Sequence, residues 1–215
     1  MRNIVDTSEY FAPEVERLNV ITHGIGLICS VVAMILLIVK AYHQDDVYYG
    51  ISLFIFGVSL VILYTSSTIY HSTKNITARK RLRILDHIAI YFIIAGTYTP
   101  FCVISLKQSN GYIILLISWT IALVGTIFKL FFIGRWDFIS TAIYVIMGWL
   151  IIFDINSLYH QLPWFGFLWL FAGGFFYTLG AIFYNFDHVK YNHSVFHVLV
   201  LLGSFCHFIS IYFYI

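Results

Sequence analysis

Residues 47–71 read VYYGISLFIFGVSLVILYTSSTIYH, and this stretch contains no Asp, Glu, Lys or Arg. Its apolar residues are continuous and do not alternate with polar ones, which favours a buried helix over a strand with one face in water. About 20 mainly apolar residues are enough for an α-helix to cross the hydrocarbon layer of a bilayer. The stretch is therefore predicted to be a transmembrane helix that ends at a histidine, His71.

Six further apolar stretches of similar character lie before and after it. They cover residues 18–42, 84–106, 112–133, 138–155, 164–183 and 193–215. The polar or basic connections between them are too short for a soluble domain. We therefore predict an all-α integral membrane protein with seven transmembrane helices. Residues 1–17 are expected to form a short cytoplasmic segment, and residues 18–215 a single transmembrane domain.

The composition agrees with this prediction and excludes other classes. Apolar residues make up 60% of the 215 residues and charged residues only 10%, whereas soluble domains carry about 25% charged residues. A soluble fold of this size could not hide so much apolar surface from water, and a disordered chain would not contain it. The net charge of +2 gives no reason to expect a nucleic-acid partner.

Basic residues indicate the orientation, because the cytoplasmic connections of membrane proteins are enriched in Lys and Arg. With seven helices, the N-terminus and the second, fourth and sixth connections lie on one side. Ten basic residues belong to that side: Arg2, Arg17, Lys74, Arg79, Lys80, Arg81, Arg83, Lys129, Arg135 and Lys190. Only Lys40 and Lys107 belong to the other side. We therefore predict a multi-pass protein of the cell membrane, with its N-terminus in the cytoplasm and its C-terminus outside.

Three histidines are predicted to meet near the cytoplasmic ends of the helices. His193 and His197 are four residues apart at the start of the last helix, so both imidazoles lie on one face, about 6 Å apart along the axis. His71 ends the second helix and Asp86 opens the third. In the predicted orientation all four residues lie within about two helical turns of the inner boundary. Ionisable groups inside a membrane are energetically costly and are usually functional.

This arrangement predicts a metal site with His71, His193 and His197 as the ligands. Histidine nitrogens suit zinc, and three protein ligands leave a fourth position open for a water molecule that the metal makes more acidic. Manganese or iron would use similar ligands. Asp86 fits the role of a base for that water better than the role of a ligand. Ser67, one turn before His71, is placed to hydrogen-bond to Asp86 or to the water, so both are candidate catalytic residues.

These residues also have structural interpretations. A single histidine inside a membrane is more often a hydrogen-bonded structural residue than a metal ligand. Asp86 would alternatively pair with Arg81 or Arg83, and Ser67 would alternatively be a small residue at a helix–helix contact.

A second polar group opens the first helix at the same depth. Asn19 and His23 share one helix face, with Glu16 one turn before Asn19. We interpret these three residues as surrounding the metal ligands or lining the path of a substrate to the metal, and the alternative is an ordinary polar helix start. His207 lies about 15 Å beyond His197 along the last helix. It is too deep for the same metal and is interpreted as a packed polar residue or part of a cavity wall.

Four motifs resemble those of a known family: Glu16-x-x-Asn19-x-x-Thr22-His23, Ser67-x-x-x-His71, Leu85-Asp86-His87 leading to Gly96-Thr97-Tyr98-Thr99-Pro100, and His193-x-x-x-His197. They are similar to the progestin and adipoQ receptor superfamily, and the first motif is similar to its bacterial branch, the hemolysin III family. The resemblance covers residues 16 to about 208. It implies seven helices and zinc held by His71, His193 and His197 near the cytoplasmic leaflet. It also relates the chain to membrane hydrolases such as ceramidases, and to haemolysis and membrane-lipid homeostasis.

Three functional hypotheses follow. The first is a zinc-dependent intramembrane hydrolase that acts on a lipid amide or ester, with a membrane lipid as its partner. The second is a membrane sensor or regulator in which zinc is structural. The third is a pore-forming hemolysin, which is less favoured because a secreted pore former must first be water-soluble and because few charges lie within the spans.

Overall fold

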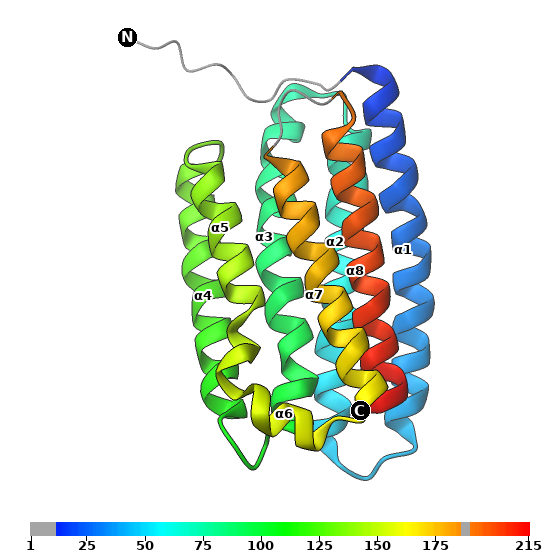
Figure 1. Cartoon of the computed structure of the whole chain (residues 1–215). Helices are drawn as coiled ribbons and strands as arrows, with labels where there is room; N and C mark the ends of the chain where they lie inside the picture. Colours follow the sequence, from blue (N-terminus) through cyan, green and yellow to red (C-terminus); the bar gives the residue numbers. More distant parts are fainter. Residues whose placement is uncertain (1–11, 186–189) are drawn as a thin grey trace.

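The computed structural model describes residues 12–185 and 190–215, and this part of the chain is built of helices without strands (Figure 1). The helices are α1 (Pro13–Tyr42), α2 (Val47–Ser72), α3 (Ile76–Pro100), α4 (Gly111–Phe132), α5 (Asp137–Gly148), α6 (Ile155–Gln161), α7 (Trp164–Tyr184) and α8 (Asn192–Tyr214). A π-helical turn (Phe101–Ser105) continues α3, and a 3-10 turn (Leu150–Asp154) joins α5 to α6. Counted this way, seven helical stretches of the described residues are long and apolar enough to cross a membrane. The predicted seven-helix membrane fold is confirmed.

Two helices begin earlier than the apolar stretches predict. α1 begins at Pro13 rather than near residue 18, and α3 begins at Ile76 rather than near residue 84. Proline suits the first turn of a helix because its missing N–H would be unpaired there anyway. The Asn75 side chain caps α3 by accepting a hydrogen bond from the Ala78 N–H, at 3.0 Å. Hydropathy marks the part of a helix that lies in hydrocarbon, whereas capping residues decide where the backbone begins to coil.

The first and last helices are neighbours in the bundle. α8 packs against both α7 and α1, and α1 packs against α2, which packs against α3 (Figure 1). α4 and α5 lie on the far side of α3. Residues from both ends of the chain are therefore brought together at the end of the bundle where α1, α3 and α8 begin.

Burial differs strongly between the helices. α3 has the most buried span, and the spans of α2 and α8 are about half buried. α1 and α4 expose large apolar side chains, for example Ile28 and Leu116, which are each 68% exposed. In a membrane such side chains face lipid, while the groups that interrupt the apolar pattern point into the bundle.

An ion-pair cluster joins three helices at the same end as the predicted histidine site. Asp137, the first residue of α5, accepts hydrogen bonds from Lys129 Nζ of α4 at 2.8 Å and from Arg83 Nη2 of α3 at 3.1 Å. The Lys129 side chain is completely buried. A buried ammonium needs such a partner, because an unpaired charge in a low-dielectric interior is strongly unfavourable. The contact therefore fixes the position of α5 relative to α3 and α4.

The distribution of basic residues predicts the orientation of this bundle. Seven spans place the two termini on opposite sides, and the side of the N-terminus carries most of the Lys and Arg residues. A C-terminal fusion to alkaline phosphatase should therefore be active in cells, and a C-terminal fusion to green fluorescent protein should be dark. A reporter inserted after Arg135 serves as the control and should behave in the opposite way. Bright fluorescence from the C-terminal fusion would contradict the predicted orientation.

Candidate metal centre

Three buried imidazoles converge at one end of the bundle. His71 lies in the last turn of α2, and His193 and His197 lie in the first two turns of α8. His193 Nε2 is 3.2 Å from His71 Nε2 and 3.1 Å from His197 Nε2. One nitrogen from each ring lies within 4.8 Å of the other two. The convergence that the spacing and depth of these residues predicted is therefore present in the fold.

The donor set and its spacing fit a metal ion. Two nitrogens bound to one tetrahedral zinc at 2.0–2.1 Å would be about 3.4 Å apart, close to the separations seen here. Imidazole nitrogens suit zinc, copper, iron and nickel. Three ligands from the protein leave room for a fourth from outside. The site could thus bind a metal, and the geometry alone does not single out zinc.

Residues of α1 hold the opposite edge of the His71 ring. Glu16 Oε2 lies 2.7 Å from His71 Nδ1, which places a hydrogen on Nδ1 because a carboxylate only accepts. Nε2 then carries no hydrogen, and its lone pair is available to bind a metal. Asn19 Nδ2 lies 3.4 Å from the same Nδ1, and Asn19 Oδ1 accepts a hydrogen bond from the Ser194 hydroxyl at 2.7 Å. α1 therefore sets both the tautomer and the orientation of one ligand.

His197 is also contacted from α1. Thr22 Oγ1 lies 3.4 Å from His197 Nδ1. The His23 ring stacks on the His197 ring, with centroids 3.5 Å apart and an angle of 14° between the planes. Neither ring nitrogen of His23 has a hydrogen-bond partner among the described residues. Glu16, Asn19 and His23, predicted to surround the ligands or line the substrate path, thus lie against the histidines.

Sequence reasoning missed the residue that holds Glu16. Arg79 Nη2 of α3 donates to Glu16 Oε1, and the Arg79 side chain is completely buried. Arg79 Nη1 also donates to the Tyr70 carbonyl at 3.0 Å, and its guanidinium lies 4.4 Å from the centre of the Tyr70 ring. Arg79 stands within a run of basic residues at 79–83, where nothing in the pattern separates a buried arginine from exposed ones.

Asp86 and Ser67 lie beside the histidines in the wall of a cavity. Both residues line it together with His193 and His197. Asp86 is close to Ser67 and to His71, and the buried Ser67 Oγ makes no well-formed hydrogen bond within the described part of the chain. Arg83, one of the alternative partners considered for Asp86, bonds to Asp137 and also lies near enough to Asp86 for an electrostatic interaction. The roles of Asp86 and Ser67 in catalysis stay predictions.

The cavity is mainly apolar and lies between α2, α3, α5, α7 and α8. Its volume is about 130 Å³. It starts at the histidines and reaches His207, ten residues beyond His197 along α8. Of the two interpretations of His207, a position in a cavity wall is therefore observed. Most of the residues between these ends are aliphatic or aromatic, such as Leu63, Ile93, Val145 and Phe171. An apolar chain with one polar end would match such a space.

Comparison with known proteins places these residues in a family context. The sequence model described as Haemolysin-III related matches residues 11–208. Hemolysin-3 of Bacillus cereus is 45% identical over 200 residues, which cover 93% of this chain and 91% of that protein. The Hemolysin-3 homolog of Bacillus subtilis strain 168 is 43% identical over 204 residues, which cover 95% and 96%. The human monocyte to macrophage differentiation factor is 25% identical over 210 residues, which cover 92% and 83%. No solved structure gives a significant match.

The converging histidines predict that the protein copurifies with a metal. Elemental analysis of protein purified without chelators should find about one metal ion per chain. His71→Ala and a His193→Ala/His197→Ala double variant should lose it, because two ligands or fewer hold a metal poorly. His160→Ala, in α6 at the other end of the bundle, serves as the control and should keep it. A folded wild-type protein that contains no metal would contradict the site.

The Glu16–His71 hydrogen bond predicts a specific effect on metal affinity. Glu16→Gln should weaken metal binding about 10–100-fold, because the neutral amide holds the Nδ1 hydrogen less firmly and lowers the basicity of Nε2. The measurement is competition with a chelator of known affinity. Glu14→Gln is the matched control, since Glu14 is exposed and its Oε1 pairs with Lys190 Nζ at 3.0 Å. Equal affinities of both variants would show that Glu16 does not tune the ligand.

Proposed function

The chain belongs to the haemolysin-III related family, and on this premise we propose that it is a zinc-dependent membrane hydrolase that cleaves a lipid amide or ester in membrane-lipid homeostasis. The membership confirms the resemblance to the hemolysin III family inferred from the motifs. The observation that carries the proposal is the meeting of three buried histidine nitrogens and a carboxylate at one end of an apolar cavity. The same residues at an aqueous surface would suggest metal storage instead.

The proposal assigns each residue a task. His71, His193 and His197 would hold the metal through Nε2, and Glu16 with Arg79 would keep His71 in the required tautomer. Zinc, when bound there, would supply Lewis acidity toward a carbonyl oxygen and lower the pKa of a water molecule. Asp86 would accept the proton of the attacking water and pass it to the leaving group. Ser67 would orient the Asp86 carboxylate by donating a hydrogen bond to it.

The cavity supports a lipid as the substrate class. Its walls would hold a hydrocarbon chain along α3, α7 and α8 while the scissile group stays beside the histidines. The basic residues near this end support a position at the cytoplasmic leaflet of the cell membrane, where lipid amides and esters have their polar groups. An amphiphile could thus present its polar group without leaving the bilayer.

A second candidate, a membrane regulator with structural zinc, is supported by the origin of the ligands. His71 belongs to α2 and the other two histidines to α8, so a bound metal would cross-link helices far apart in the sequence. In that case removal of the metal would lower the melting temperature, and no lipid would be turned over.

Asp86→Asn separates the two candidates. If Asp86 is the base, the variant should lose about 10²–10⁴-fold in lipid hydrolysis, because an amide cannot take up the proton. It should keep its zinc, since the three histidines are intact. The assay follows release of fatty acid from a panel of amide and ester lipids by protein in nanodiscs.

Asp46→Asn is the control for that experiment. Asp46 caps α2 at the opposite end of the bundle by accepting from the Tyr48 N–H at 2.9 Å, and asparagine is an equally good N-cap. This variant should hydrolyse lipids at the wild-type rate. Unchanged hydrolysis in Asp86→Asn would remove Asp86 from the mechanism, and absence of turnover by the wild type would favour the regulator.

A further inference from the structure

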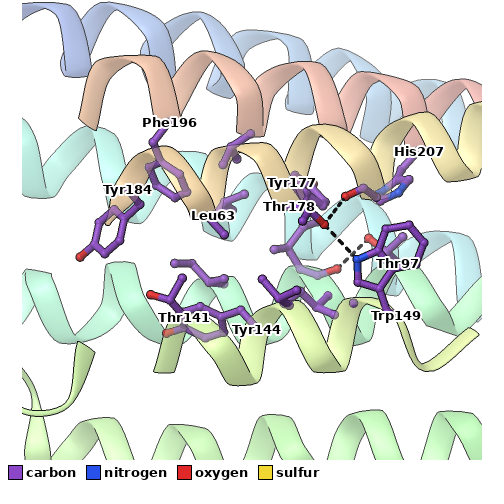
Figure 2. A pocket seen from close by; sticks show the side chains of 18 of the residues that line it. Leu63, Thr97, Thr141, Tyr144, Trp149, Tyr177, Thr178, Tyr184, Phe196 and His207 are labelled. Atoms are coloured by element: carbon purple, nitrogen blue, oxygen red, sulfur yellow. Dashed lines mark hydrogen bonds between the residues drawn. The ribbon is translucent and has the colours of Figure 1, made fainter. Parts of the chain in front are cut away.

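The end of the cavity that is remote from the metal centre carries a second group of polar side chains. Figure 2 shows Thr97, Trp149, Tyr177, Thr178 and His207 gathered there. Tyr184, Phe196, Thr141 and Tyr144 lie toward the other end (Figure 2). A space built only for hydrocarbon would be closed by aliphatic or aromatic residues. Polar side chains at the end of a cavity inside a membrane protein need hydrogen-bond partners.

The donors of three of these side chains are already engaged within the protein. Trp149 Nε1 donates to Thr178 Oγ1 at 2.9 Å, and the Thr178 hydroxyl donates to the Gly174 carbonyl at 2.8 Å. The Thr97 hydroxyl donates to the Ile93 carbonyl at 2.7 Å. These groups therefore have no hydrogen left for a ligand. What the two hydroxyls still offer is lone pairs on oxygen.

His207 adds an acceptor that has no partner. Its Nε2 lies 3.2 Å from the Leu170 carbonyl, and a carbonyl only accepts, so Nε2 carries the hydrogen. A buried histidine that bonds to no carboxylate is expected to be neutral, with a hydrogen on only one ring nitrogen. Since Nε2 carries that hydrogen, Nδ1 carries none and can only accept a hydrogen bond. Nδ1 is buried and has no hydrogen-bond partner among the described residues. A buried acceptor without a donor is unfavourable, so the arrangement is incomplete as it stands.

Turning the ring to satisfy this nitrogen would break the hydrogen bond between Nε2 and the Leu170 carbonyl. Gly173 of α7 lies so close to Cδ2 and Nε2 of His207 that a side chain there would collide with the ring. The glycine thus leaves room for the edge that bears Nε2, and the Leu170 carbonyl holds that edge against α7. Tyr177, whose hydroxyl is engaged with Ser204 Oγ at 2.8 Å, packs edge-on against the same ring. The Nδ1 edge is therefore held away from Gly173.

We propose that this remote end of the cavity binds a hydroxyl group on the chain of the lipid, which donates a hydrogen bond to His207 Nδ1. The proposal rests on the proposed function, in which the polar head of the same lipid lies at the histidines. From His197 to His207 the helix rises about 15 Å. An extended hydrocarbon advances about 1.3 Å per carbon, so the hydroxyl belongs about 12 carbons from the head group. The ligand class is a hydroxylated single-chain amphiphile.

The test compares two ligands that differ only in the distal hydroxyl. Dodecanoic acid and dodecanoic acid with a terminal hydroxyl are equilibrated with metal-loaded protein in nanodiscs by dialysis, and binding to empty nanodiscs is subtracted. The carboxylate of both stands for the product of hydrolysis. The hydroxylated acid should bind about tenfold more tightly, because it supplies the missing donor. Equal affinities, or tighter binding of the plain acid, would overturn the proposal.

Two variants assign the effect to the ring nitrogen. His207→Phe keeps a planar ring but has no acceptor, and it should bind both acids equally. His207→Asn can place its amide oxygen near the position of Nδ1 and still accept, so it should keep part of the preference. A preference that survives unchanged in His207→Phe would overturn the assignment. Hydrolysis is measured separately with plain-chain lipids, so failure of the hydroxyl preference and failure of the proposed hydrolase remain distinguishable.

Discussion

The hydrogen bond between the Glu16 carboxylate and His71 Nδ1 is the contact on which the rest of the candidate metal centre depends. It decides which nitrogen of His71 carries no hydrogen, and so whether the three histidine nitrogens could bind one metal. A carboxylate inside a membrane needs a cation, and Arg79 provides it. Arg79 in turn satisfies a carbonyl at the end of α2 through its bond to Tyr70. The need to keep a hydrogen on His71 Nδ1 thus links α1, α2 and α3.

The placement of polar groups follows from the solvent that surrounds the bundle. Lipid gives no hydrogen bonds, so each buried charge must find its partner within the protein. The Lys129–Asp137–Arg83 cluster and the Glu16–Arg79 pair both lie where helices begin or end. At the opposite end Lys40 Nζ bonds to the carbonyl of Tyr212 at 2.6 Å, in the last turn of α8. The middle of the bundle relies on apolar packing, on hydroxyls bonded to their own helices, and on neutral hydrogen bonds between helices, such as the one between Tyr177 and Ser204.

Much of the fold could be predicted from the sequence, because an apolar stretch long enough to cross a bilayer forms a transmembrane helix. The spacing of His193 and His197 and the depth of His71 are enough to predict that the three side chains meet. The part that could not be predicted depends on how helices pack. The role of Arg79 depends on which face of α3 turns toward α1. The cavity depends on side chains from six helices, and the apolar pattern of each helix alone does not reveal a space between them.

The order in which the helices are made has a consequence for how the centre forms. Chains are synthesised from the N-terminus, and the ligands come from α2 and from α8, the last helix. Glu16, His71 and Arg79 are all made early, on α1, α2 and α3, whereas His193 and His197 are made last, on α8. A chain interrupted before residue 192 would carry six spans and a single ligand. A metal bound at this centre would therefore be taken up late in biogenesis, and only by chains in which α8 has been inserted and has reached its place between α7 and α1.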